Sequence, residues 1–143
     1  TGGPEVGPTY YAVARGETGH YEAIRVVYDP KQVSYEALLA TFWHNVDPTQ
    51  ANGQFCDRGD QYRTAVFVAT GAERTAATAS KTSAEETLGK TVVTPILPKQ
   101  SFWLAEAYHQ DFYKKSPTRY RSYRAGCGRD HRLLQLWGDQ AGK

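Results

Sequence analysis

Three short runs rich in β-branched and aromatic residues alternate with three segments of helical periodicity along this 143-residue chain. The runs cover residues 22–28, 63–69 and 91–97, and the helical segments cover 34–45, 73–88 and 103–115. A chain that alternates in this way folds into a sheet with helices against it. We therefore expect an α/β fold, in the form of an α+β two-layer sandwich with a mixed sheet, packed helices and a long wrapped C-terminal tail.

The ends of the predicted elements are marked by capping and breaking residues. Ser34 is a good N-cap, and apolar residues then recur at helical spacing over residues 35–43. Asp47-Pro48 stops that helix, and Gly89 is expected just beyond the next one. Pro95 interrupts the third run, which predicts an edge position or the end of a strand.

Composition limits the class of protein. The length suits one domain over residues 1–143, and 40% hydrophobic residues suffice for a core. The 17 Lys and Arg nearly balance the 15 Asp and Glu, which argues against a dedicated nucleic-acid binder. No stretch approaches the roughly 18 apolar residues of a membrane span, so we expect no membrane contact.

Residues 114–132 carry basic side chains interleaved with tyrosines. Such a pattern binds single-stranded nucleic acid in some proteins. The alternative is a wrapped tail whose tyrosines pack on the core while its arginines stay solvated. The balanced charge elsewhere favours the tail, so we expect no nucleic-acid partner. The four histidines lack paired ligand spacing, and we expect neither a metal nor a cofactor.

A long polar loop, residues 49–60, precedes the second predicted strand. Cys56, Asp57 and Tyr62 place a thiol, a carboxylate and a phenol close together there. Long loops in compact domains tend to carry function, and a buried Asp beside a Tyr can hold a polar oxygen of a ligand. A solvated loop in which Asp57 forms a turn is the alternative.

Glu22 follows His20 and Tyr21 at the start of the first predicted strand. Desolvation beside aromatic rings disfavours the carboxylate and raises the pKa, so such a residue can act as a general acid near neutral pH. A surface glutamate is the alternative reading. His20 is more typical of a structural, hydrogen-bonded histidine than of a base.

The chain has two cysteines, Cys56 and Cys127. They are too few for a disulfide framework or a four-cysteine zinc site, but they could pair, act as redox thiols or be inert. Cys127 lies between two glycines, and Arg124 and Arg129 would favour its thiolate. A mobile thiol of this kind can travel to a partner, although a spectator cysteine is the alternative. Redox thiols indicate a reducing, cytoplasmic setting.

Six stretches together resemble the methionine sulfoxide reductase A family and run in that family's order. They are residues 7–10, 18–22, 26–30, 42–50, 56–63 and 105–111. Asp-Pro-Thr-Gln followed by Asp-X-Gly-X-Gln-Tyr-Arg, behind Gly-His-X-Glu, is highly specific at this spacing. The ending Cys127-Gly128-Arg129-Asp130 resembles one branch of the family.

The resemblance implies a reaction, its substrate and its reductant. The family reduces methionine S-sulfoxide, free or in peptides. A cysteine thiolate attacks the sulfoxide sulfur while an acid protonates the oxygen, and a sulfenic acid forms. A second thiol converts the sulfenic acid to a disulfide, which a thioredoxin-type dithiol reduces.

The resemblance also implies roles for particular residues. Glu22 matches the family's acid, and Tyr10 and Tyr62 match the phenols that bind the sulfoxide oxygen. Asp57 matches the carboxylate that orients the site. Cys127 is the best candidate for the resolving thiol, and Cys56 is the weaker candidate.

One departure concerns the nucleophile. The family carries it in a Gly-Cys-Phe-Trp motif, which does not occur here, and Thr1-Gly2-Gly3 resembles the stretch that follows the motif. The resemblance therefore implies a domain that lacks its N-terminal catalytic segment. A sheet without one strand exposes an edge, so we expect a dimer or strand exchange. A non-catalytic peptide-binding module on the same scaffold is the alternative function, because it needs no nucleophile.

Overall fold

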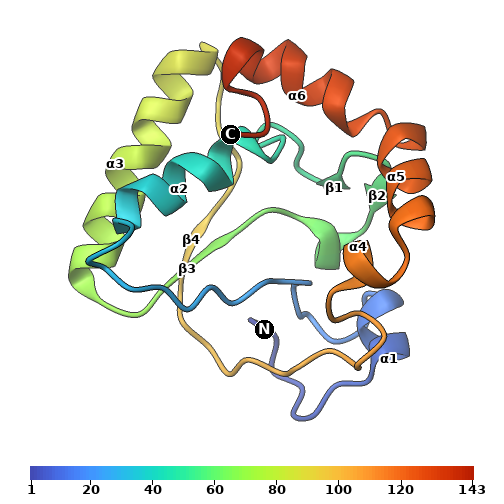
Figure 1. Cartoon of the computed structure of the whole chain (residues 1–143). Helices are drawn as coiled ribbons and strands as arrows, with labels where there is room; N and C mark the ends of the chain where they lie inside the picture. Colours follow the sequence, from blue (N-terminus) through green and yellow to red (C-terminus); the bar gives the residue numbers. More distant parts are fainter.

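Six α-helices and two small sheets make up the computed structural model, which describes residues 1–143 (Figure 1). In chain order the elements are α1 (Tyr10–Ala14), α2 (Tyr35–His44), β1 (Gly53–Gln54), β2 (Asp57–Arg58), the 3₁₀ turn η1 (Asp60–Tyr62), β3 (Val66–Val68), α3 (Gly71–Leu88), β4 (Ile96–Pro98), α4 (Phe112–Lys115), α5 (Pro117–Gly126), α6 (Arg129–Trp137) and the 3₁₀ turn η2 (Gly138–Gln140). None of the helices is long and apolar enough to cross a membrane.

The two sheets differ in the relative direction of their strands. Strand β3 pairs with β4 in parallel, with Val66 opposite Ile96, whereas β1 and β2 form an antiparallel hairpin with Gln54 opposite Asp57. Parallel and antiparallel pairing therefore both occur, and helices lie against the strands. The α/β class predicted from the sequence is confirmed, in a form with small sheets.

The capping signals correctly locate the two central helices. The hydroxyl of Ser34 accepts a hydrogen bond from the amide of Ala37 at the start of α2. Helix α3 begins at Gly71, slightly before the predicted residue 73, because Thr70 caps it through the amide of Glu73. Gly89 ends α3 in the left-handed conformation, as expected of a residue without Cβ.

Residues 22–28 form no strand, so this prediction is wrong. The amide of Glu22 donates to the carbonyl of Gln61, but no amide of residues 23–28 donates to a backbone carbonyl. Ile24 is 88% exposed and Val27 is 89% exposed. β-branched residues favour extended backbone, but a strand needs a neighbour to complete its hydrogen bonds, and these residues have none in this chain.

The other two predicted strands are shorter than expected. Only Val66–Val68 and Ile96–Pro98 pair. Pro95 lacks an N–H and joins the ladder only through its carbonyl, which accepts from the amide of Val66. The amide of Val92 donates to the side chain of Glu85 instead of to a strand.

The predicted helix over residues 103–115 is also wrong for most of its length. Only α4 is helical, and residues 101–106 have no regular structure. Asp111 has a φ of 54° immediately before α4, a left-handed conformation that a right-handed helix cannot continue through. Leu133, Leu136 and Trp137 also predict a short terminal helix over residues 129–137, and it is present as α6. Helix α5 lies within the stretch expected to be a wrapped tail.

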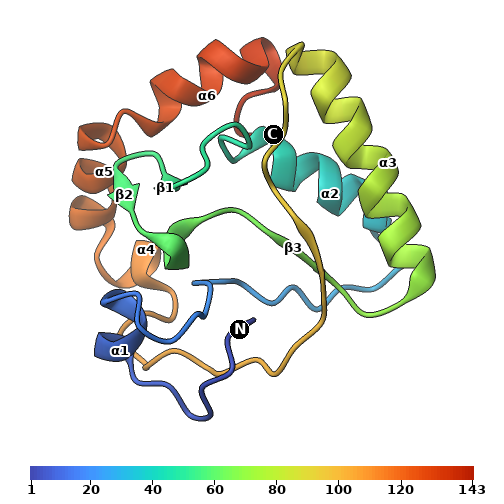
Figure 2. The same cartoon turned by 180° about the vertical axis from the view of Figure 1, so that it is seen from behind.

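Two hydrophobic clusters form the core: the larger lies where α2, α3 and α6 gather, and the smaller lies between α2, α3 and β3 (Figures 1 and 2). The larger contains Trp43, Phe55, Ala84, Val92, Leu133 and Trp137. The smaller contains Leu39, Val66, Val68 and Ala77. The opposite end of the molecule holds α1, α4 and long irregular segments. The ionisable and aromatic side chains of the candidate site lie there.

Candidate active site

A cavity of about 180 Å³ lies between the N-terminal segment, residues 20–23 and residues 103–109. Its lining combines aromatic rings with ionisable groups: Tyr10, His20, Tyr21, Glu22, Trp103, Glu106 and His109, among others. Tyr10 and Glu22, two residues predicted from the sequence, both line it. Asp57, Tyr62 and Cys127 do not.

Gln61 holds Glu22 and Tyr62 in adjacent positions. Its side-chain amide donates to the carbonyl of Ala14, at the end of α1, over 2.8 Å. Its backbone carbonyl accepts from the amide of Glu22, also over 2.8 Å. Because Gln61 is buried and its neighbour is Tyr62, one residue of η1 brings the phenol, the carboxyl and α1 together.

The Glu22 carboxyl has a pKa above its ordinary value. Loss of water around it is the main cause, and the Asp57 carboxylate raises the pKa further, while His109 acts in the opposite direction. The residue as a whole is exposed, so the raised pKa reflects local crowding and not deep burial. A carboxyl in this state can hold a proton and deliver it to a ligand.

The pKa of the Tyr62 phenol is affected by some of the same groups. Burial is the main cause of its raised pKa, and Glu22, Asp57 and Tyr10 raise it further, against a hydrogen bond with Gln61 that lowers it. These influences place Tyr10, Glu22 and Asp57 within electrostatic reach of Tyr62. Phenols and a protonated carboxyl are O–H donors, which suit a ligand oxygen.

Tyr123 of α5 is a further phenol beside this group. Its hydroxyl donates to both carboxylate oxygens of Asp57 and lies 3.8 Å from the sulfur of Cys56. Burial, followed by the hydrogen bond to Asp57, raises the pKa of Tyr123 to about 12. Asp57 is thus bonded to α5, and the same phenol connects it to the cysteine pair.

The two cysteines form a disulfide with each other. Cys56 is exposed at the tip of the β1–β2 hairpin, and the half-buried Cys127 lies between α5 and α6. Their Cα atoms are 5.1 Å apart although 71 positions separate them in sequence. Of the possibilities left open by the sequence, pairing is the one observed.

His20 has a structural role, as its residue type suggested. The residue is 3% exposed, its Nδ1 accepts from the amide of Gly3, and its Nε2 bonds the carbonyl of Glu5. The backbone amide can only donate, so Nδ1 must be the acceptor and Nε2 must carry the proton. Both nitrogens are therefore occupied in fastening the N-terminal segment over the cavity.

Much of the basic stretch has partners within the chain. Arg124 pairs with Asp130, and Arg132 pairs with Asp47. Arg129 lies over the ring of Phe55, with its guanidinium carbon 4.6 Å from the ring centre. These contacts hold residues 114–132 against the rest of the chain, as expected of a wrapped tail. The expected division of roles is wrong, because these arginines are partnered within the chain while Tyr123 is 48% exposed.

Sequence reasoning missed three residues that shape the site: Gln61, His109 and Tyr123. Gln61 and His109 lie in stretches that carry the family resemblance, but neither was assigned a role. The ring of His109 lies 4.5 Å from that of Tyr10, and its Nε2 is buried without a hydrogen-bond partner. Tyr123 was visible only as one of several tyrosines in a basic stretch.

Comparison with protein families gives a match along almost the whole chain. The family described as peptide methionine sulfoxide reductase matches residues 1–141. The chain is 52% identical to peptide methionine sulfoxide reductase MsrA 2 of Caulobacter vibrioides, over 96% of this chain and 70% of that protein. It is 44% identical to MsrA of Bacillus subtilis, over 96% of this chain and 79% of that protein.

Solved structures show the same likeness. Mxr1 of Saccharomyces cerevisiae in its reduced form aligns with a TM-score of 0.75 and 33% identity, over 77% of this chain. Methionine sulfoxide reductase A of Corynebacterium diphtheriae aligns with a TM-score of 0.70 and 31% identity, over 82% of this chain. The aligned part spans 61% of each of those two chains.

Proposed function

Because the chain belongs to the peptide methionine sulfoxide reductase family, we propose that its function is to reduce methionine S-sulfoxide, free or in peptides, to methionine. The observation that carries this proposal is the family match over residues 1–141. The grouping of Glu22, Tyr10 and Tyr62 supports it, because a sulfoxide oxygen needs O–H donors as its bond to sulfur weakens. A purely peptide-binding module is not favoured, since the relatives are named as reductases.

Glu22 would supply the proton in the first step. A thiolate attacks the sulfoxide sulfur, the S–O bond breaks, and the oxygen is transferred to the attacking sulfur as a sulfenic acid while methionine leaves. The oxygen must gain a proton, and a carboxyl with a raised pKa retains one at higher pH than an ordinary glutamate. Tyr10 and Tyr62 would donate hydrogen bonds to the same oxygen, and Asp57 would orient the group.

The cysteine pair would then remove the oxidising equivalents. Cys127 attacks the sulfenic acid, which releases water and leaves a mixed disulfide. Cys56 attacks the sulfur of Cys127, which frees the nucleophile and gives the Cys56–Cys127 bond. A thioredoxin-type dithiol attacks the exposed Cys56, becomes a disulfide itself and returns both cysteines to thiols. Such recycling suits a reducing compartment, and we place the protein in the cytoplasm on that ground.

The first thiol would come from a Gly-Cys-Phe-Trp segment outside these 143 residues, as part of the same single domain in the parent protein. Two observations support this. The motif does not occur within residues 1–143, and the relatives above extend beyond the matched part, which is 70–79% of their length. Cys56 is the alternative nucleophile within the chain.

A second copy of the chain is the proposed occupant of the uncovered extended segment 22–28. Residues Ile24 and Val27 are almost fully exposed there, and their backbone amides lack partners in the chain. Unpaired extended backbone with apolar side chains is a template for pairing with another chain. Dimerisation or strand exchange would cover it.

An activity assay tests the proposed function. It measures consumption of a methionine S-sulfoxide peptide with excess dithiothreitol, on samples whose intact mass is recorded. We expect turnover by the parent protein and none at 15.9 kDa, the mass of this chain. Turnover at 15.9 kDa that Cys56→Ser abolishes would assign the nucleophile to Cys56 and overturn only that part. No turnover by the parent protein would overturn the function itself.

A further inference from the structure

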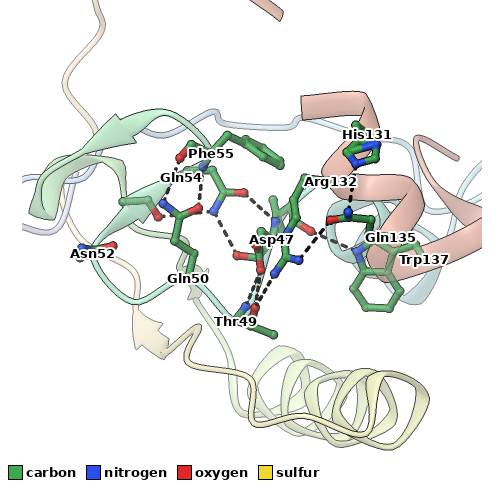
Figure 3. Close-up of polar contacts among 12 residues, drawn as sticks. Asp47, Thr49, Gln50, Asn52, Gln54, Phe55, His131, Arg132, Gln135 and Trp137 are labelled. Atoms are coloured by element: carbon green, nitrogen blue, oxygen red, sulfur yellow. Dashed lines mark hydrogen bonds and ion pairs between the residues drawn. The ribbon is translucent and has the colours of Figure 1, made fainter. Parts of the chain in front are cut away.

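An ion pair joins helix α6 to the loop that follows α2 (Figure 3). The Nε of Arg132 donates to Oδ2 of Asp47 over 2.7 Å, and its Nη2 donates to the hydroxyl of Thr49 over 3.3 Å. Asp47 is 3% exposed. A buried carboxylate needs such compensation, because its desolvation is costly when it is left unpaired.

Asp47 is also bonded to the hairpin that carries Cys56. Its amide donates to Oε1 of Gln54 over 2.6 Å, and its carbonyl accepts from the same side chain over 3.1 Å. Gln54 is the last residue of β1, two positions before Cys56. An unbroken set of hydrogen bonds therefore runs from α6 through Asp47 to the hairpin (Figure 3).

The tip of the hairpin is fixed in turn. Phe55 has a φ of 54°, which is unusual for a bulky side chain. Gln50 bonds both sides of it, accepting from the amide of Phe55 over 2.7 Å and donating to its carbonyl over 3.2 Å. Cys56, the next residue, is consequently presented at a defined place.

Cys127 stands at the other end of the same connection. It precedes Gly128, the N-cap of α6, and Arg132 lies in the first turns of that helix. A cavity of about 380 Å³ is lined by Cys127, Arg132, Asp47 and Phe55, among others. The ion pair thus adjoins the space beside the cysteine and is not a remote surface contact.

We propose that Asp47 and Arg132 are a positioning pair that holds Cys127 within bonding reach of Cys56. Neither residue forms a hydrogen bond with a sulfur atom. Their effect is exerted through α6 on one side and through the hairpin on the other, so that the two thiols meet at a high effective concentration. The Cys56–Cys127 bond itself is in the structure, whereas its use in recycling rests on the proposed function.

The pKa of Asp47 is consistent with this arrangement. Burial acts to raise it, but the hydrogen bonds from Thr49 and Arg132 outweigh that effect, and the pKa is lowered from the ordinary value. Asp47 therefore stays ionised and paired at neutral pH. By linkage, if the pair favours the disulfide, the disulfide favours the pair to the same extent.

Redox titration of the chain in glutathione buffers tests the proposal without methionine sulfoxide. In the equilibrium, the protein dithiol and glutathione disulfide give the protein disulfide and two glutathione molecules. Arg132→Ala should lower the equilibrium constant for Cys56–Cys127 formation about tenfold or more, which corresponds to a reduction potential about 30 mV less negative. Asp47→Asn should act in the same direction. The double variant should not exceed the larger single effect by much, because both changes break one pair.

Arg124→Ala is the matched control. It removes another arginine–aspartate pair beside Cys127, but Arg124 and Asp130 both lie within residues 124–130 and do not tie α6 to the hairpin. The equilibrium constant should stay within about twofold of the native value, as for an exposed ion pair. Arg132→Lys keeps the charge and should restore part of the native constant.

Unchanged redox equilibrium in Arg132→Ala would overturn the proposal, and so would an equal shift in Arg124→Ala. If Arg132→Ala proves unfolded by circular dichroism, Arg132→Lys decides the matter, because it should fold and still show a measurable loss. A native equilibrium constant in that variant would then count against the pair. Failure of the proposed function would appear only in the peptide assay and leave this titration unaffected.

Discussion

At the residue scale, the Glu22 carboxyl combines an exposed position at the edge of a cavity with a raised pKa. Loss of water around it is the main cause, and Asp57 nearby raises the pKa further. A protonated carboxyl is therefore retained to higher pH than in a free glutamate, whose pKa is about 4.3. His109 acts against this shift.

In the parent protein, Glu22→Gln should reduce the rate of sulfoxide reduction by about 10²–10⁴-fold, because the proton donor is lost. Without that substitution, kcat/KM of the parent protein should fall as pH rises through the pKa of Glu22, since only the protonated form donates. The pH–rate profile of the variant should lack that step. Glu36→Gln, on the exposed face of α2, is the control and should leave the profile unchanged. A native pH step in Glu22→Gln would show that another group supplies the proton.

Tyr123→Phe should lower the free energy of unfolding of the oxidised chain modestly. The change removes the hydroxyl that donates to Asp57, and a hydrogen bond to a charged group at this exposed position contributes about 1 kcal/mol. Because the pKa of Tyr123 is about 12 in the folded chain and about 10 in the unfolded chain, the loss should be constant from neutral pH to about pH 9 and should shrink as the pH rises from about 10 towards 12. Urea unfolding at several pH values measures it. Tyr11→Phe, at a residue that is 71% exposed, should have no comparable effect, and equal losses would refute the role given to the Asp57 bond.

At the level of elements, those set by interactions close in sequence could be predicted, and those that depend on distant residues could not. Helix α2 was predictable because Ser34 and the apolar stripe after it act locally. The segment 22–28 was not, because a strand depends on a neighbour elsewhere and its β-branched residues say nothing about where that neighbour is. The irregular stretch before α4 depends on the left-handed backbone of Asp111, which its residue type alone does not reveal.

The residues of the candidate site also divide into those that the sequence could predict and those that it could not. Glu22, Tyr10, Asp57 and Tyr62 could be named because they lie in recognisable motifs. Tyr123 and the Asp47–Arg132 pair could not, since each joins residues more than sixty positions apart and arises only when α5 and α6 fold back over the hairpin.

The turn η1 depends on Gly59, and its replacement tests that element. Gly59 has a φ of 133°, and an added Cβ would lie 2.5 Å from Oε1 of Gln61. Gly59→Ala should lower the free energy of unfolding by about 1–3 kcal/mol and displace Gln61 from Ala14. Gly126→Ala, in helix α5 with open space around it, should be neutral or stabilising by up to about 1 kcal/mol. Thermal unfolding of both variants measures the contrast, and equal stability would contradict the role of Gly59.

At the scale of the whole molecule, the disulfide joins residues 71 positions apart and closes a loop that contains β2, β3, α3, β4, α4 and α5. Closing a loop of that length restricts the unfolded chain, and the entropy lost corresponds to about 4 kcal/mol of stability. Dithiothreitol should therefore lower the free energy of urea unfolding by up to that amount. A Cys56→Ser, Cys127→Ser double variant should be insensitive to the reductant. Identical unfolding curves for the oxidised and reduced native chain would show that the loop is already restrained by other contacts.

The extended segment 22–28 leaves backbone without hydrogen-bond partners at the surface. We therefore expect two copies of the chain to associate through it. Apolar side chains at Ile24 and Val27 face solvent while the backbone between them has unused hydrogen-bonding groups. Light scattering over a concentration series should show the mass rising from 15.9 kDa towards twice that value. Val27→Lys should hold the chain at the monomer mass, since a charge at an exposed edge opposes pairing. Val6→Lys makes the same change at a residue 80% exposed outside the segment and should still associate. A native chain that stays monomeric throughout the series would mean that this backbone remains solvated and unpaired.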